Sequence, residues 1–119
     1  MTNWKNLDTL DSYKALKACK GSVDLTTVMA GESGADRAKN YSVPMAEKLT
    51  YNFAAKEVDD TVLEKLAALA KEAELVDKFQ ELYNGAVINT GENRLVLHQM
   101  TRGQLGESRQ MAWIREHFT

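Results

Sequence analysis

An apolar stripe between residues 62 and 70 constrains the fold of this sequence more than any other feature. Its members are Val62, Leu63, Leu66, Leu69 and Ala70. Apolar residues three and four positions apart share one face of an α-helix, and Glu64, Lys65 and other charged residues fill the opposite face. Asp59 or Asp60 precedes the stripe and can cap the helix. The sequence therefore predicts an amphipathic helix whose apolar face needs a packing partner.

A second helix is predicted directly after the first. Beyond Glu74 the helical period resumes at Leu75, Val76, Phe79, Leu82 and Tyr83. Asn84-Gly85 then supplies the left-handed ending that is common at helix C-termini. Two successive helices that pack antiparallel are the expected arrangement.

The first 48 residues also favour helices. Residues at helical spacing predict the first of them, which Gly21 ends: Trp4, Leu7, Leu10, Tyr13 and Leu16. Two shorter helices are predicted over residues 24–29, followed by Gly31, and over residues 33–40, where Ser33 is a plausible cap.

One strand or extended segment is predicted near residues 49–53, where Leu49, Tyr51 and Phe53 alternate with polar residues. Pro44 restricts Val43 to extended conformations, but no partner strand is evident in the sequence. Further helices are predicted over residues 94–101 and 107–118. The expected fold class is mainly α, a bundle of short and medium helices with one short strand.

Composition excludes several classes of function. Apolar residues make up 44% of the 119 residues and charged residues 27%, as in ordinary globular chains. Fifteen basic residues against 17 acidic ones, without a basic block, argue against a nucleic-acid partner. The first 20 residues contain no basic segment followed by an apolar run, and no apolar run of about 18 residues occurs, so we expect neither a signal peptide nor a membrane span. A single cysteine, Cys19, fits a reducing compartment, and we expect a cytoplasmic protein.

The residues by themselves indicate little chemistry. His98 and His117 lack neighbours at the spacing of a metal site, and Cys19 has no evident base. Ser33 does not lie in a nucleophile elbow, and the two glycines at 103 and 106 are too few for a phosphate-binding loop. We therefore expect no catalytic residue, no substrate-binding residue, no metal and no cofactor within this chain.

A resemblance adds to this picture. Residues 83–98 read Tyr-Asn-Gly-Ala-Val-Ile-Asn-Thr-Gly-Glu-Asn-Arg-Leu-Val-Leu-His. This stretch resembles the segment of glucose-6-phosphate isomerases written roughly as Phe-x-Gly-x-x-Ile-Asn-x-Thr-Glu-x-Arg-x-Val-Leu-His. The helix over residues 62–72 looks like the one that precedes that segment in the family, and Leu49 to Asn52 falls where an apolar-Asp-Tyr-Ser segment is usual. We trace the resemblance from about Leu49 to Gly106.

The resemblance implies the N-terminal part of an otherwise α/β enzyme of the sugar-isomerase fold. The intact family member interconverts glucose 6-phosphate and fructose 6-phosphate, in glycolysis and gluconeogenesis, by ring opening and enediol proton transfer. Its Gly-Ile-Gly-Gly-Ser phosphate loop, its glutamate base and its ring-opening histidine lie further along the chain and have no counterpart here. The expected partners are the remaining domains of the same enzyme and a second copy in a homodimer, and the isolated chain is expected to be inactive.

The sequence also departs from the family pattern. Thr90-Gly91-Glu92 replaces the commoner x-Thr-Glu, and the segment after Gly106 is shorter than usual. Residues 1–48 share with the family only the expectation of helices before the extended segment, and not diagnostic residues. We therefore divide the chain into a helical arm, 1–48, and a helical segment, 49–119.

Four residues of the matching stretch are candidates for a structural role: Asn89, Glu92, Arg94 and His98. Glu92 and Arg94 can pair and fix the turn into the predicted helix, and His98 can extend that network. Two alternatives remain open: a stand-alone helical interaction module of shared ancestry, and an isomerase half completed by a second polypeptide.

Overall fold

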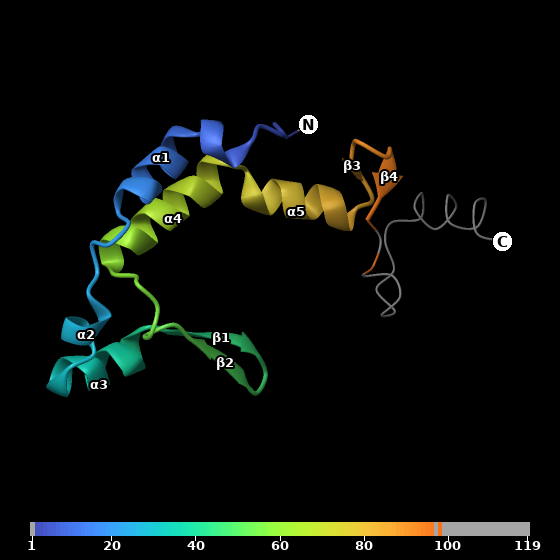
Figure 1. Cartoon of the computed structure of the whole chain (residues 1–119). Coiled ribbons are helices and arrows are strands. Elements are labelled where there is room, and N and C mark those ends of the chain that lie inside the picture. Colours follow the sequence, from blue (N-terminus) through green and yellow to red (C-terminus); the bar gives the residue numbers. More distant parts are fainter. Residues whose placement is uncertain (1, 97, 99–119) are drawn as a thin grey trace. The chain divides into compact units, whose positions relative to one another are not determined.

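The computed structural model describes residues 2–96 and residue 98 (Figure 1). Within them the chain forms two compact units. The larger unit consists of residues 5–72. The smaller unit combines residues 2–4 with the described residues from Ala73 on. The position of residue 48, where the sequence suggested a division, lies in a turn inside the larger unit.

The larger unit begins with a short 3-10 helix, η1 (Leu7–Thr9), and the helix α1 (Asp11–Ala18). The predicted first helix is therefore divided in two, and Gly21, with φ of 78°, turns the chain after it as expected. The helix α4 (Asp60–Glu72) lies beside α1 (Figure 1). Asp59 caps α4, because its carboxylate accepts the Val62 backbone N–H at 2.8 Å. The predicted helix and cap are thus confirmed, and the packing partner of this helix within the unit is α1.

Two short helices follow α1. The helix α2 (Leu25–Val28) is capped by Asp24, which accepts from the Thr26 amide and the Thr27 hydroxyl. The helix α3 (Gly31–Asn40) follows at once. Ser33 is not its cap: the Ser33 hydroxyl donates to the Ala30 carbonyl from inside the first turn. The close approach of the two helices explains Gly34, since a Cβ there would lie 2.2 Å from the Met29 oxygen.

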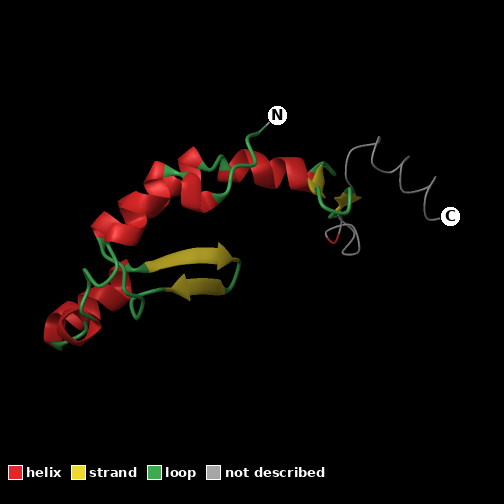
Figure 2. Ribbon diagram, turned by 45° about the horizontal axis from the view of Figure 1, so that its top comes forward, coloured by secondary structure: helices red, strands yellow, loops and turns green. Residues whose placement is uncertain are grey.

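The predicted strand has a partner that the sequence did not reveal. β1 (Ser42–Ala46) pairs antiparallel with β2 (Leu49–Asn52), with Val43 opposite Tyr51 and a bulge near Met45 (Figure 2). Pro44 is tolerated because each strand of a two-stranded ribbon is an edge. The expectation of a single strand was wrong, since the extended conformation imposed at Val43 belongs to a full hairpin.

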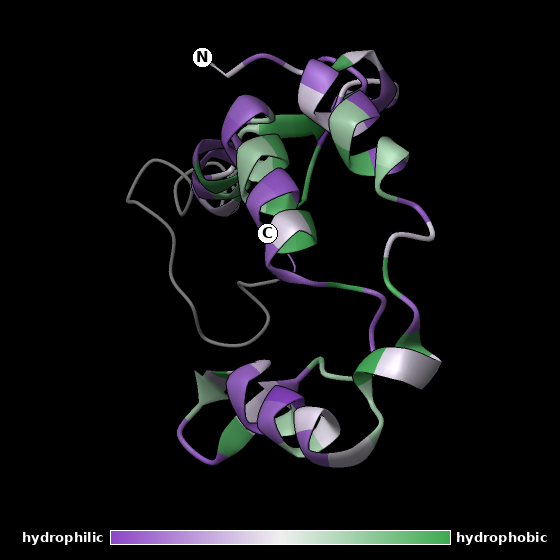
Figure 3. Ribbon diagram, turned by 90° about the vertical axis from the view of Figure 1, so that its left-hand side faces the viewer, coloured by the Kyte–Doolittle hydropathy of each residue, from purple (hydrophilic) through white to green (hydrophobic). Residues whose placement is uncertain are grey.

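The core of the larger unit is small. Its buried apolar residues are Leu10, Val23, Ala54 and Val62. The helical ribbons carry both hydrophobic and hydrophilic stretches, as amphipathic elements do (Figure 3). Within the hairpin the apolar side chains of Val43, Met45, Leu49 and Tyr51 are all exposed.

The smaller unit is built on the helix α5 (Leu75–Tyr83). Glu74, with a left-handed φ of 52°, separates it from α4, and Gly85, with φ of 78°, ends it as predicted. The strands β3 (Val87–Asn89) and β4 (Arg94–Leu95) then pair as an antiparallel hairpin.

The hairpin β3–β4 corrects the helix predicted from residue 94. Asn93 adopts a left-handed φ of 54°, so the chain turns back and Leu95 pairs with Val87 instead of beginning a helix. Most of the rest of that predicted helix, and all of the one over residues 107–118, lies outside the described residues. Among the described residues the mainly helical class is confirmed, with two small antiparallel sheets there in place of one strand.

Candidate functional site

Three of the four candidate residues meet in the hairpin β3–β4. The Asn89 amide donates to a Glu92 carboxylate oxygen at 3.2 Å, and the Glu92 backbone N–H donates to the Asn89 side-chain oxygen at the same distance. Arg94 Nη1 lies 3.7 Å from Glu92 Oε2. Asn89 ends β3 and Arg94 begins β4, so the pairing of the strands brings the three side chains together.

This cluster is open to solvent. The side chains of Arg94 and Glu92 are 75% and 61% exposed. Hydrogen bonds across the turn stabilise the hairpin, whereas an exposed ion pair at 3.7 Å adds little. Glu92 and Arg94 therefore lie at the turn of a hairpin and not at the entrance to a helix. His98, also exposed, follows four residues beyond Arg94.

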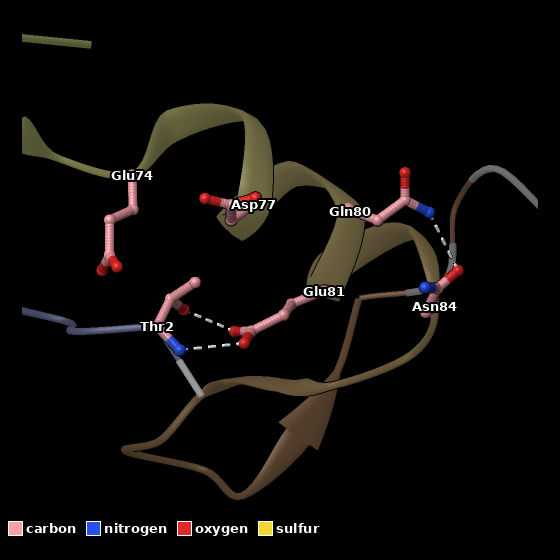
Figure 4. A pocket seen from close by; sticks show the side chains of 6 residues that line it. All are labelled: Thr2, Glu74, Asp77, Gln80, Glu81 and Asn84. Atoms are coloured by element: carbon pink, nitrogen blue, oxygen red, sulfur yellow. Dashed lines mark hydrogen bonds between the residues drawn. The ribbon is translucent and has the colours of Figure 1, made fainter. Parts of the chain in front are cut away.

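A pocket lies on the smaller unit, at the polar side of α5 (Figure 4). This pocket has a volume of about 400 Å³, and its lining residues are Thr2, Glu74, Asp77, Gln80, Glu81 and Asn84. The Thr2 amide and hydroxyl both donate to the Glu81 carboxylate, at 3.0 and 2.6 Å. Gln80 donates to Asn84 at 3.2 Å.

The electrostatics of this pocket do not suit a sugar phosphate. Three of its six lining residues are acidic and none is basic. The hydrogen bonds from the Thr2 hydroxyl and amide lower the pKa of Glu81, because they stabilise its charged form. A phosphate dianion placed here would be repelled, because anions are held by cations and by backbone N–H groups.

A third group of residues centres on Arg37 in the larger unit, and no sequence pattern predicted it. Arg37 is the one buried charged residue among those described, with 7% exposure. Its guanidinium donates to the backbone carbonyls of Ala54, Lys56 and Val58 and lies over the Tyr41 ring. An arginine in a short polar helix looks like a surface residue, so no pattern distinguishes it.

Two further observations apply to the described residues. No group of three or more histidine, cysteine, aspartate or glutamate side chains there is arranged to hold a metal ion. No helix in that part of the chain has the length and apolar character needed to cross a membrane.

Comparison with known proteins decides the family. A family model described as phosphoglucose isomerase matches residues 52–111, just over half of the chain. The chain belongs to the phosphoglucose isomerase family. The β3–β4 cluster lies inside the matched region, so the resemblance inferred from residues 83–98 is confirmed.

Individual isomerases agree with this assignment. The glucose-6-phosphate isomerase of Treponema denticola is 49% identical over 106 residues, which cover 86% of this chain and 20% of that protein. The isomerase of Borreliella afzelii is 38% identical over 108 residues, or 90% of this chain and 19% of its own length. The chain thus spans about one fifth of the curated isomerases it matches, corresponding to a short N-terminal segment of them.

A solved structure extends the likeness to three dimensions. The crystal structure of a glucose-6-phosphate isomerase from Chlamydia trachomatis matches with a TM-score of 0.74 and 31% identity, over 93% of this chain and 23% of that one. An aligned stretch of 106 residues is longer than the segment from Leu49 to the last residue. The similarity to the family therefore reaches into the first 48 residues, where the sequence analysis found no diagnostic residues and only the shared expectation of helices.

Proposed function

We propose that this chain forms the N-terminal helical part of a glucose-6-phosphate isomerase and is inactive by itself. The observation that carries the proposal is the similarity of most of this chain to about one fifth of the isomerases. In the intact enzyme we propose interconversion of glucose 6-phosphate and fructose 6-phosphate through ring opening and an enediol. We further propose that the enzyme works in the cytoplasm.

The chemistry of the described residues supports an inactive segment. Proton transfer between two sugar carbons needs a general base held at the substrate carbon, and the phosphate needs convergent cations or amides. The β3–β4 cluster is exposed and self-paired, and the pocket on α5 is acidic. We propose a structural role for Asn89, Glu92, Arg94 and His98, and no contact with substrate.

The exposed apolar side chains support a partner in the same enzyme. On α5, Leu75, Val76 and Phe79 are 57%, 79% and 65% exposed. Residues 2–4 occupy the polar side of this helix, through hydrogen bonds from Thr2 to Glu81 and from the Asn3 amide to Glu74. An amphipathic helix normally buries its apolar stripe. We propose that the remaining domains of the isomerase cover this stripe, and that the intact enzyme is a homodimer.

The test of activity uses a coupled dehydrogenase assay with fructose 6-phosphate. Three samples are compared: this chain, the Treponema denticola isomerase without its matching segment, and the two together. We expect no turnover from the chain alone and restored turnover from the mixture. Turnover that co-purifies with the chain alone would overturn the proposal.

The docking of α5 is tested separately by association of the two polypeptides, for example by analytical ultracentrifugation. Phe79→Ser on the stripe should weaken the association, whereas Gln80→Ser on the polar side should not. Equal binding by both variants would show that the stripe is not the contact surface.

A further inference from the structure

The backbone of residues 54–58 converges on one side chain. Arg37 Nε donates to the Ala54 carbonyl at 2.7 Å, and Nη2 donates to the Lys56 carbonyl at 2.9 Å and to the Val58 carbonyl. The guanidinium carbon lies 4.3 Å from the centroid of the Tyr41 ring. Three oxygens and an aromatic face thus surround one planar cation.

This arrangement is unusual for a buried charge. Within the described residues Arg37 forms no ion pair with a carboxylate, although buried charges are normally paired. Carbonyl dipoles satisfy it instead, and the Tyr41 ring adds a cation–π contact.

Hydrogen bonds within residues 53–58 position the carbonyls that accept from Arg37. The Lys56 amide donates to the Phe53 carbonyl, and the Val58 amide donates to the Lys56 carbonyl at 2.8 Å. These two turns place alternate carbonyls on one side of the backbone, where they accept from Arg37. Ala54, at 3% exposure, is the most buried apolar residue of the unit.

The same loop leads directly into α4. Asp59, the next residue, caps the helix through the Val62 amide, and Asp60 accepts from the Tyr41 hydroxyl at 2.9 Å. Arg37 and Tyr41 lie one helical turn apart, and the Tyr41 amide donates to the Arg37 carbonyl. The end of α3 therefore holds both the loop and the first residue of α4.

We propose that residues 54–58 form a guanidinium-binding cage, with Arg37 as its internal ligand, and that occupancy of the cage fixes the start of α4. The cage recognises the planar fork of the guanidinium and not charge alone. A lysine ammonium is a compact point charge and cannot present two nitrogens to three separated carbonyls in the same plane.

The test measures amide hydrogen exchange at Val62 and Leu63, the first turn of α4, in the whole chain. Arg37→Ala should speed this exchange by at least about tenfold. Millimolar guanidinium chloride should slow it again in this variant, whereas sodium chloride at the same ionic strength should not. Arg94→Ala is the matched control and should leave these amides as in the unmodified chain.

Arg37→Lys separates the cage from a simple need for positive charge. If the proposal holds, the Val62 and Leu63 amides of this variant also exchange rapidly, and guanidinium slows their exchange. If Arg37→Ala does not fold in buffer, recovery of helical circular dichroism in guanidinium but not in sodium chloride is the equivalent result. Unchanged exchange in Arg37→Ala, full protection in Arg37→Lys, or equal rescue by sodium would each overturn the proposal.

Discussion

Two arginines of this chain have opposite surroundings. Arg37 is 7% exposed and donates to three backbone carbonyls, whereas the Arg94 side chain is 75% exposed and faces one carboxylate at 3.7 Å. Sequence reasoning selected Arg94, because it lies in a recognisable family stretch, and overlooked Arg37. The contribution of an arginine to the free energy of unfolding thus depends more on its burial and on the number of fixed acceptors than on an oppositely charged neighbour.

The largest expected effect comes from Arg37→Ala. Three backbone carbonyls, one of them buried and two partly buried, would lose this donor, so we expect the free energy of unfolding to fall by about 3 kcal/mol. Arg94→Ala should change it by about 0.5 kcal/mol or less. Chemical denaturation of both variants measures the difference, and equal losses would remove the distinction between the two sites.

Asp59→Ala is expected to come next. Asp59 follows the loop that Arg37 holds, and its carboxylate satisfies the Val62 amide at the start of α4. Loss of this cap should cost about 1 kcal/mol, whereas Asp59→Asn should cost little because its amide oxygen also caps. Thermal unfolding followed by circular dichroism distinguishes the variants. A large loss in Asp59→Asn would mean that charge, and not capping, is needed there.

Tyr41→Phe tests the Arg37 site through the pH dependence of its stability. Burial, and then the hydrogen bond to Asp60, raise the pKa of the Tyr41 phenol. Folding therefore favours the neutral Tyr41 phenol. Its contribution to the free energy of unfolding is complete below a pH of about 10 and is lost as the pH rises through the pKa of the folded chain. Tyr41→Phe should cost about 0.5 kcal/mol at neutral pH and should reduce the alkaline loss of stability.

The alkaline contribution is measured by denaturation at a series of pH values. Tyr51→Phe is the control, since Tyr51 is 45% exposed and lies in the hairpin β1–β2. Identical alkaline behaviour of Tyr41→Phe and the unmodified chain would show that Tyr41 is not the titrating group.

The smallest effect is expected for Glu92→Ala. The hydrogen bonds with Asn89 and the contact with Arg94 are exposed, so the loss should be a few tenths of a kcal/mol and should diminish at high salt. Nuclear magnetic resonance shifts of the β3–β4 turn would detect local rearrangement. A loss comparable to that of Arg37→Ala would reverse the ranking of the two clusters.

The amphipathic helices could be predicted because their information is local. The stripe from Val62 to Ala70, the Asp59 cap and the left-handed ending at Gly85 all depend on residues within a few positions of one another. The family could also be recognised, because Asn89, Glu92 and Arg94 form a motif in a short stretch. The part that Arg94 plays could not, because a left-handed Asn93 turned the expected helix into a hairpin.

The main helices, the Asp59 cap, the ending at Gly85 and the membership of the phosphoglucose isomerase family thus follow from the sequence alone. Three features became evident only in the folded chain: α1 packs beside α4, β1 pairs with β2, and Arg37 is buried among carbonyls. Helical periodicity and capping can be read from the sequence because they involve residues within one or two helical turns of one another. A strand partner or a buried cation depends on groups that the fold alone brings together, such as Arg37 and the carbonyl of Val58.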